Sequence, residues 1–156
     1  VCRLAEKAND MTISMGVALG PCSLPHTLEP SFVLEGNEME IGLGIHGEAG
    51  VRKGPLQSAD EITTELMDKI LNEMGGSKKV SVLVNGLGST PLMELYIMYR
   101  KTYEILNKNQ IEIHSSFVGE YVTSLEMNGA SITLMKLDEE LQPLLERETL
   151  CSMFRV

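Results

Sequence analysis

The order of helices and strands restricts the fold of this sequence more than any other feature. Two segments, residues 59–74 and 92–107, have the helical spacing of apolar residues, and each lies between segments of strand composition. The second helix follows a buried strand, Lys79–Val84, and precedes another at Ile111–Val122. This alternation predicts an α/β or α+β domain: a two-layer mixed β-sheet with helices packed on one face.

The remaining elements follow from composition and from turn residues. Strands are expected at Met11–Leu19, Ser31–Leu34, Glu38–Ile45 and Ser131–Leu137, and a short helix at Glu139–Glu146. The second and third of these strands should form a hairpin, and residues 47–57 should form a loop. Residues 1–10 have the spacing of the last turns of a helix already under way, so we expect a cut piece of a longer protein or one chain of a nicked one.

Short motifs indicate where the two main helices begin and where the first of them ends. Ser58 and Glu61 have the spacing of a capping box, and Gly75-Gly76 is a helix stop. Thr90 is expected to be the N-cap of the next helix, with Pro91 at its first position. The first helix is expected to serve packing and to carry no chemistry.

Composition excludes several classes of function. The chain has 156 residues, enough for one domain with a hydrophobic core, and a net charge of −9. That charge argues against binding to nucleic acid or to an anionic membrane surface. We find neither a membrane-spanning stretch nor a signal peptide. Cys2, Cys22 and Cys151 lack zinc-like spacing, so we expect thiols in a cytoplasmic protein and no metal site.

The stretch Glu38–Gly50 carries the main candidate for chemistry. Residues 39–45 alternate as in a strand, and four glycines surround His46, with Glu48 two residues later. Glycine within a strand often marks the close approach of a ligand or of another backbone. We therefore expect His46 to be presented to a small ligand at a strand end. An ordinary surface histidine beside a turn stays open as the alternative.

Three other features are weaker candidates. His26 lies in a proline-rich loop and is expected to be solvated, whereas His114 should be a structural histidine in its strand. The segment Asn85–Pro91 is a glycine-bearing turn between a strand and a helix, a place where phosphate can bind. It lacks the complete dinucleotide or Walker pattern, so a plain tight turn is favoured.

Several of these stretches together resemble a known family. They are residues 16–22, 30–32, 37–50, 83–95 and 131–138, of which Ile-His-Gly-Glu-Ala-Gly at 45–50 is the most specific. The sequence resembles the dihydroxyacetone-binding DhaK subunit of dihydroxyacetone kinases, in particular its C-terminal domain. The resemblance runs in order over nearly the whole chain, and residues 1–156 are identified as that domain. The family's usual motif has Pro where this chain has Ala49.

The resemblance implies a role for His46. In that family the matching histidine attacks the ketone carbonyl of dihydroxyacetone through Nε2 and forms a covalent hemiaminal. Such a link selects short ketones over polyols such as glycerol, and it positions the reacting hydroxyl for phosphoryl transfer. Gly44 and Gly47 would leave room for the adduct. Glu48 would orient the imidazole or bind a substrate hydroxyl, or else have a structural role.

The family's N-terminal domain is absent from this sequence. That domain carries a Gly-Gly-Gly-Ser-Gly-His-Glu-Pro loop and a general-base aspartate, and neither is found in these 156 residues. The missing roles are not transferred to His26, His114 or Asp10. This piece alone is therefore expected to be inactive without its own N-terminal domain.

The resemblance also implies partners. The family uses ADP or ATP with Mg on a DhaL-type subunit, which a DhaM-type phosphocarrier recharges from phosphoenolpyruvate, or on a nucleotide domain of the same chain. We expect no cofactor in this chain, the phosphoenolpyruvate-dependent type, and a homodimer. Two alternatives stay open: a dihydroxyacetone-sensing transcriptional co-regulator without turnover, and a nonfunctional scaffold.

Overall fold

The computed structural model describes residues 1–23, 30, 32–43 and 50–150. The helices are α1 (Cys2–Asp10), α2 (Ala59–Met74), α3 (Leu92–Lys108) and α4 (Gln142–Leu145). The strands are β1 (Thr12–Ala18), β2 (Glu38–Ile41), β3 (Arg52–Pro55), β4 (Lys79–Gly86), β5 (Glu112–Gly119) and β6 (Gly129–Lys136). These strands belong to a single mixed sheet.

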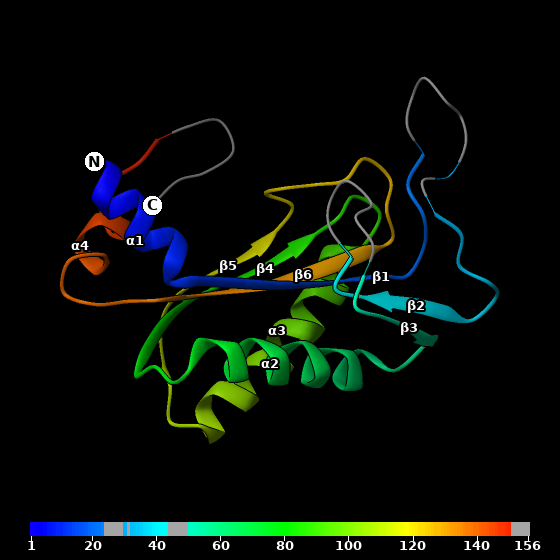
Figure 1. The fold of residues 1–156 in the computed structure, drawn as a ribbon, viewed down its shortest axis with the longest axis horizontal. Helices are drawn as coiled ribbons and strands as arrows, with labels where there is room; N and C mark the ends of the chain where they lie inside the picture. Colours follow the sequence, from blue (N-terminus) through cyan, green and yellow to red (C-terminus); the bar gives the residue numbers. More distant parts are fainter. Residues whose placement is uncertain (24–29, 31, 44–49, 151–156) are drawn as a thin grey trace.

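The strand order of the sheet is β3-β2-β1-β6-β4-β5. β4 and β5 run parallel and are connected through α3, as the strand–helix–strand pattern predicts, and the other neighbouring pairs are antiparallel. Figure 1 shows α2 and α3 along one face of the sheet, with α1 and α4 together at one end of it. The predicted two-layer α/β architecture with helices on one face is confirmed.

The core lies between the sheet and the helices α2 and α3. Val80, Val82 and Val84 alternate along β4 and have 0% of their surface exposed, because alternate side chains of a strand point to the same face. Leu66 and Ile70, one turn apart on α2, are buried to the same extent. Each such side chain contributes about 1.5–3 kcal/mol when it leaves water. This packing fixes β1 and β4, whose residues line the candidate site.

The helix α2 begins and ends at the predicted residues. The Ser58 hydroxyl accepts from the Glu61 N–H at 3.4 Å, and the Glu61 carboxylate accepts from the Ser58 N–H at 2.9 Å. Gly75 follows with φ of +67°, the left-handed conformation that ends many helices. The capping box is therefore confirmed, and its reciprocal bonds satisfy two orphan backbone donors.

The predicted N-cap of α3 is wrong. Pro91, not Thr90, is the N-cap residue, and it makes no side-chain capping bond. The Thr90 hydroxyl instead donates to the Gly129 carbonyl at 2.7 Å and accepts from the Gly129 N–H at 3.0 Å. Thr90 is only 7% exposed, and buried polar groups need partners, so this tertiary contact replaces the local one.

The strands near the candidate site also differ from expectation. Residues 32–34 form no strand, and β2 pairs with β1 on one side and with β3 on the other, so the predicted hairpin is wrong. β3 lies within the segment for which the sequence predicts a loop. Arg52 of β3 makes a bidentate pair with Glu65 of α2, at 3.1 and 2.5 Å. This pair and the ladder with β2 stabilise a strand whose composition is not strand-like.

The last helix is shorter than predicted. α4 spans only Gln142–Leu145, and Pro143 lies in its first turn. The Asp138 carboxylate accepts from the N–H groups of Glu140 and Leu141, each at 3.0 Å, so the residues before α4 form a turn closed by a side chain.

Candidate functional site

The predicted site residues fall on a segment outside the described residues. His46, Gly44, Gly47 and Glu48 all belong to it, and His26 likewise lies outside the described residues. The chain leaves β2 through Gly42 and Leu43 and returns at Gly50 to enter β3. The described residues therefore establish how both ends of the His46-bearing segment, residues 42–50, are held.

The two ends of the His46-bearing segment are held side by side through the backbone. The Gly42 N–H donates to the Gly16 carbonyl of β1, and the Val51 N–H donates to the Ile41 carbonyl of β2, both at 2.7 Å. Gly42 has φ of +83°, and a β-carbon there would lie 2.7 Å from Cγ2 of Val51. Only glycine meets both conditions without strain, so a glycine is required where the segment begins.

A buried carboxylate holds the far end of the same segment. Glu40 of β2 is only 5% exposed, and its Oε1 accepts from the Gly50 N–H at 2.7 Å. Its Oε2 lies 3.6 Å from Nζ of Lys53, the residue opposite it on β3. Sequence reasoning missed Glu40. The alternation that assigned this strand put Glu40 and Gly42 on the same side, but it does not indicate the bond to Gly50, ten residues later.

A cavity of about 290 Å³ lies next to Gly42 and Leu43. Its lining comes from the neighbouring strands β1, β4 and β6 and includes Ser14, Asn85 and Thr133. The hydroxyls of Ser14 and Thr133 bond to each other at 2.6 Å, which leaves hydroxyl lone pairs for another partner. The cavity is small, partly polar and next to the start of the His46-bearing segment.

Side chains of the turn Asn85–Pro91 form hydrogen bonds to the connection between β5 and β6. The Asn85 side chain donates to the Val122 carbonyl at 2.7 Å and accepts from the N–H groups of Tyr121 and Val122 at 2.8 and 2.9 Å. The Ser89 hydroxyl donates to the Glu126 carbonyl at 2.6 Å. These polar groups are engaged within the protein, which favours the interpretation as a structural turn over a phosphate site.

His114 has the structural role that the sequence predicts. Its side chain is 19% exposed, and its Nε2 lies 3.1 Å from Oε1 of Glu146. This contact connects β5 to the end of α4. The imidazole therefore has a partner inside the fold.

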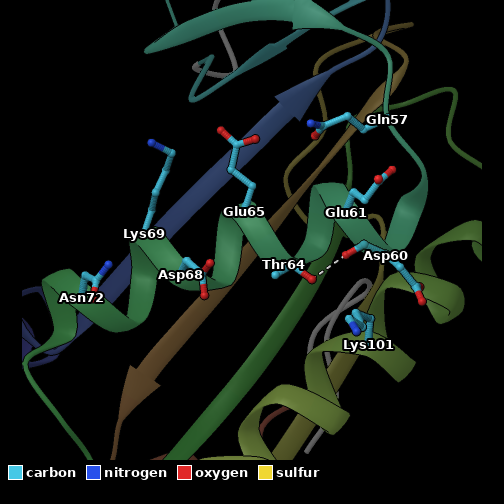
Figure 2. A pocket seen from close by; sticks show the side chains of 9 residues that line it. All are labelled: Gln57, Asp60, Glu61, Thr64, Glu65, Asp68, Lys69, Asn72 and Lys101. Carbon is cyan, nitrogen blue, oxygen red and sulfur yellow. Dashed lines mark hydrogen bonds between the residues drawn. The ribbon is translucent and has the colours of Figure 1, made fainter.

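A larger hollow, of about 520 Å³, lies on the outer face of α2. Figure 2 shows acidic side chains spaced along this helix with Lys69 among them and Lys101 on the adjacent helix α3. Glu65 pairs with Arg52, and Asp60 pairs with Arg100 of α3. The Ser58 hydroxyl, followed by its backbone N–H, lowers the pKa of Glu61. In this hollow, Asp60, Glu61 and Glu65 therefore have partners within the fold.

Metal ligands and membrane-spanning helices are two further features that bear on function. In residues 1–23, 30, 32–43 and 50–150, no group of three His, Cys, Asp or Glu side chains is placed to hold a metal ion. No helix in the same ranges combines the length and the apolar character that crossing a bilayer requires.

A protein family and several curated proteins match this chain. The family described as "Dak1 domain" matches residues 1–152. The dihydroxyacetone-binding subunit DhaK of PTS-dependent dihydroxyacetone kinase 2 from Listeria innocua is 46% identical over 144 residues, which are 91% of this chain and 44% of that protein. The chain thus spans less than half the length of this relative.

Two solved structures have the same fold. The dihydroxyacetone kinase operon co-activator Dha-DhaQ has a TM-score of 0.81 at 35% identity, over 88% of this chain and 43% of that one. The dihydroxyacetone kinase from C. freundii, in complex with AMP-PNP and Mg2+, has a TM-score of 0.78 at 27% identity. That match covers 98% of this chain and 31% of the kinase.

Proposed function

Because this chain belongs to the Dak1 domain family, we propose that it is the part of a dihydroxyacetone kinase that holds the ketone substrate covalently on His46. The observation that carries the proposal is the Dak1 match over residues 1–152, which include the Ile-His-Gly-Glu sequence at 45–48. The 46% identity to a DhaK subunit over 91% of the chain supports it. The product of the complete enzyme is dihydroxyacetone phosphate.

The chemistry requires a neutral imidazole. The Nε2 lone pair of His46 adds to the carbonyl carbon, and the C–O π electrons move to oxygen. The new alkoxide takes up a proton and the imidazole loses the one on Nδ1, so no other reactant is consumed. The hemiaminal fixes the substrate while a terminal hydroxyl receives the phosphoryl group, a reaction in which positioning supplies much of the rate. Gly44 and Gly47 give the adduct space, and Glu48 supports the imidazole or binds a substrate hydroxyl.

The rest of the machinery belongs to other parts of the protein or to other subunits. The N-terminal domain supplies the general base, so this domain alone is inactive. ADP or ATP with Mg is held by a DhaL-type subunit, and the phosphoryl group comes from phosphoenolpyruvate through a DhaM-type carrier. The identity to a PTS-dependent subunit favours this route over an ATP-dependent one. The protein acts in the cytoplasm as a homodimer, without nucleic acid or membrane partners.

A second candidate is a sensor. A protein of this family could bind dihydroxyacetone and regulate a transcription factor without turnover. The 35% identity to the co-activator Dha-DhaQ, over 88% of this chain, favours this alternative. Both candidates use the same covalent chemistry at His46, and they differ only after the substrate is bound: the kinase transfers a phosphoryl group to it and the sensor does not.

Intact mass of the full-length protein with dihydroxyacetone, under mild conditions, tests the covalent site. We expect a mass increase equal to one substrate molecule, which peptide mapping assigns to the peptide that carries His46. His46→Ala should lose the increase and His114→Ala should retain it, because His114 lies outside the Ile-His-Gly-Glu sequence and contacts Glu146. A folded protein without the increase would overturn the proposal. Phosphoryl transfer after addition of a nucleotide subunit would then distinguish the kinase from the sensor.

A further inference from the structure

We propose that Glu40 is a positioning residue for the proposed covalent step at His46: its buried carboxylate fixes the point at which the His46-bearing segment rejoins the sheet. This inference rests on the function proposed above. Glu40 itself lies on β2, before the segment begins. It therefore acts on the reaction through the backbone that it holds and has no contact with the substrate in this proposal.

Burial makes the Glu40 carboxylate an unusual feature of this sheet. The residue is 5% exposed, and a buried carboxylate is costly unless it is paired or hydrogen-bonded. Oε1 accepts from the Gly50 N–H at 2.7 Å, while Lys53, whose side chain is 50% exposed, stays 3.6 Å from Oε2. The backbone bond is thus the close contact, and the lysine compensates the charge at longer range.

The packing around Gly50 shows that its backbone rests directly on the Glu40 side chain. A β-carbon at Gly50 would lie 2.6 Å from Cγ of Glu40 and 2.7 Å from the Ile41 carbonyl oxygen. Any other residue at this position would push the chain away from the carboxylate. The glycine and the glutamate therefore form one matched contact between the two ends of the segment.

Of the three hydrogen bonds described at these ends, the one from Gly50 is made to a side chain. Gly42 bonds to Gly16, and Val51 bonds to Ile41, both between backbone atoms, so a change of the Glu40 side chain removes neither bond. The Glu40 bond can therefore be removed while the ladder with β1 and β3 is kept. A displacement of about 1 Å at a reacting group can cost about 10²-fold in rate.

A matched pair of variants separates the reach of the side chain from its charge. Glu40→Gln keeps the length and an oxygen acceptor for the Gly50 N–H, but it loses the charge near Lys53. Glu40→Asp keeps the charge and withdraws the acceptor by one methylene. We expect Glu40→Gln to retain adduct formation within about threefold, and Glu40→Asp to lower the rate of adduct formation by about tenfold or more.

The experiment measures the rate and the extent of adduct formation by intact mass in the full-length protein, together with amide hydrogen exchange at Gly50. Glu65→Asp is the control, because it perturbs the carboxylate that pairs with Arg52 of β3 without touching Gly50. We expect faster exchange at Gly50 in Glu40→Asp alone. Equal effects of Glu40→Gln and Glu40→Asp, or wild-type rates in Glu40→Asp, would overturn the inference.

The two proposals fail in different ways. If the wild-type protein forms no adduct, the function proposed for His46 fails, whatever the Glu40 variants do. Amide exchange at Gly50 still tests whether Glu40 fixes the segment, because it needs no substrate. If the wild type forms the adduct and both Glu40 variants form it at the same rate, the positioning role alone is wrong.

Discussion

Single buried side chains determine the shape of the loops in this protein. Asn85 is 2% exposed and makes three hydrogen bonds to the backbone of Tyr121 and Val122. The side-chain amide of Asn85 thus provides both a donor and an acceptor to the connection between β5 and β6. At residues 121 and 122 this connection is not part of a β-sheet. Gly88 lets the same connection pack closely against the turn, since a β-carbon there would lie 2.1 Å from the Leu125 carbonyl oxygen.

Removing the Asn85 amide should destabilise the protein clearly. In Asn85→Ala, two N–H groups and one carbonyl lose their partner, and an unsatisfied buried group costs about 1–3 kcal/mol. We expect a free energy of unfolding lower by at least about 1–3 kcal/mol in urea denaturation. Asn72→Ala, on the exposed face of α2, is the control and should change it by less than about 0.5 kcal/mol. An equal effect of both would show that the Asn85 bonds contribute nothing.

At the scale of elements, the helix α2 could be predicted from sequence and the strand β3 could not. The boundaries of α2 follow from Ser58 and Gly75, which act on backbone groups within one turn of themselves. β3 has no such local signal, because its residues Arg-Lys-Gly-Pro become a strand only through pairing with β2 and the contact of Arg52 with Glu65. Thr90 was misassigned for the same reason: its partner, Gly129, is distant in sequence.

In the candidate site, too, features set by local sequence could be predicted, and contacts between residues distant in sequence could not. The alternation in residues 39–45 placed β2 correctly up to Ile41, and the strand ends there because Gly42 adopts a positive φ. The role of Glu40 depends on Gly50, ten residues later, and no local pattern reports that bond. Predictions for His46, Gly44, Gly47 and Glu48 stay predictions, since these residues lie outside the described ranges.

Disruption of the capping box tests the contribution of one helix end. Ser58→Ala removes the acceptor for the Glu61 N–H and should lower the free energy of unfolding by about 1 kcal/mol. The same hydroxyl is the main cause of the lowered pKa of Glu61, so that pKa should rise toward its ordinary value in the variant. Thermal denaturation and an NMR titration measure the two effects. Ser58→Thr keeps the hydroxyl and should change neither; a Glu61 pKa unchanged in Ser58→Ala would contradict the assignment.

At the scale of the whole molecule, ion pairs connect the first helix to the last part of the chain. Arg3 and Lys7 of α1 contact Glu140, at 2.7 and 2.5 Å, and Lys7 also contacts Asp138. Hydrogen bonds from Arg3 and then Lys7 lower the pKa of Glu140 from 4.5 to about 2. Figure 1 shows α1 and α4 together at one end of the sheet, away from β2 and β3, and these ion pairs connect α1 to the residues just before α4.

Acid should loosen this end of the molecule first. Because the pKa of Glu140 is lower in the folded state, its stabilising contribution is present above about pH 4.5 and is lost as the pH falls toward 2. The protection factors for hydrogen exchange in α1, which are corrected for the intrinsic pH dependence of exchange, should therefore fall across that range, and added salt should weaken the pairs at neutral pH. Glu140→Gln should show the faster exchange already at neutral pH, whereas Glu148→Gln should behave as wild type. Protection factors in α1 that are independent of pH would contradict this.

The pairing of β1 with β6 has a consequence for how the chain reaches this fold. β1 lies near the start of the sequence, yet its long ladder, from Thr12 opposite Met135 to Ala18 opposite Gly129, is made with the last strand. During synthesis on a ribosome, β1 emerges before β6 and lacks this neighbour until β6 has been translated. Contacts between distant parts of a chain slow folding and leave strand edges open to aggregation. A circular permutant that brings the two strands together in sequence should therefore fold faster in a stopped-flow refolding measurement.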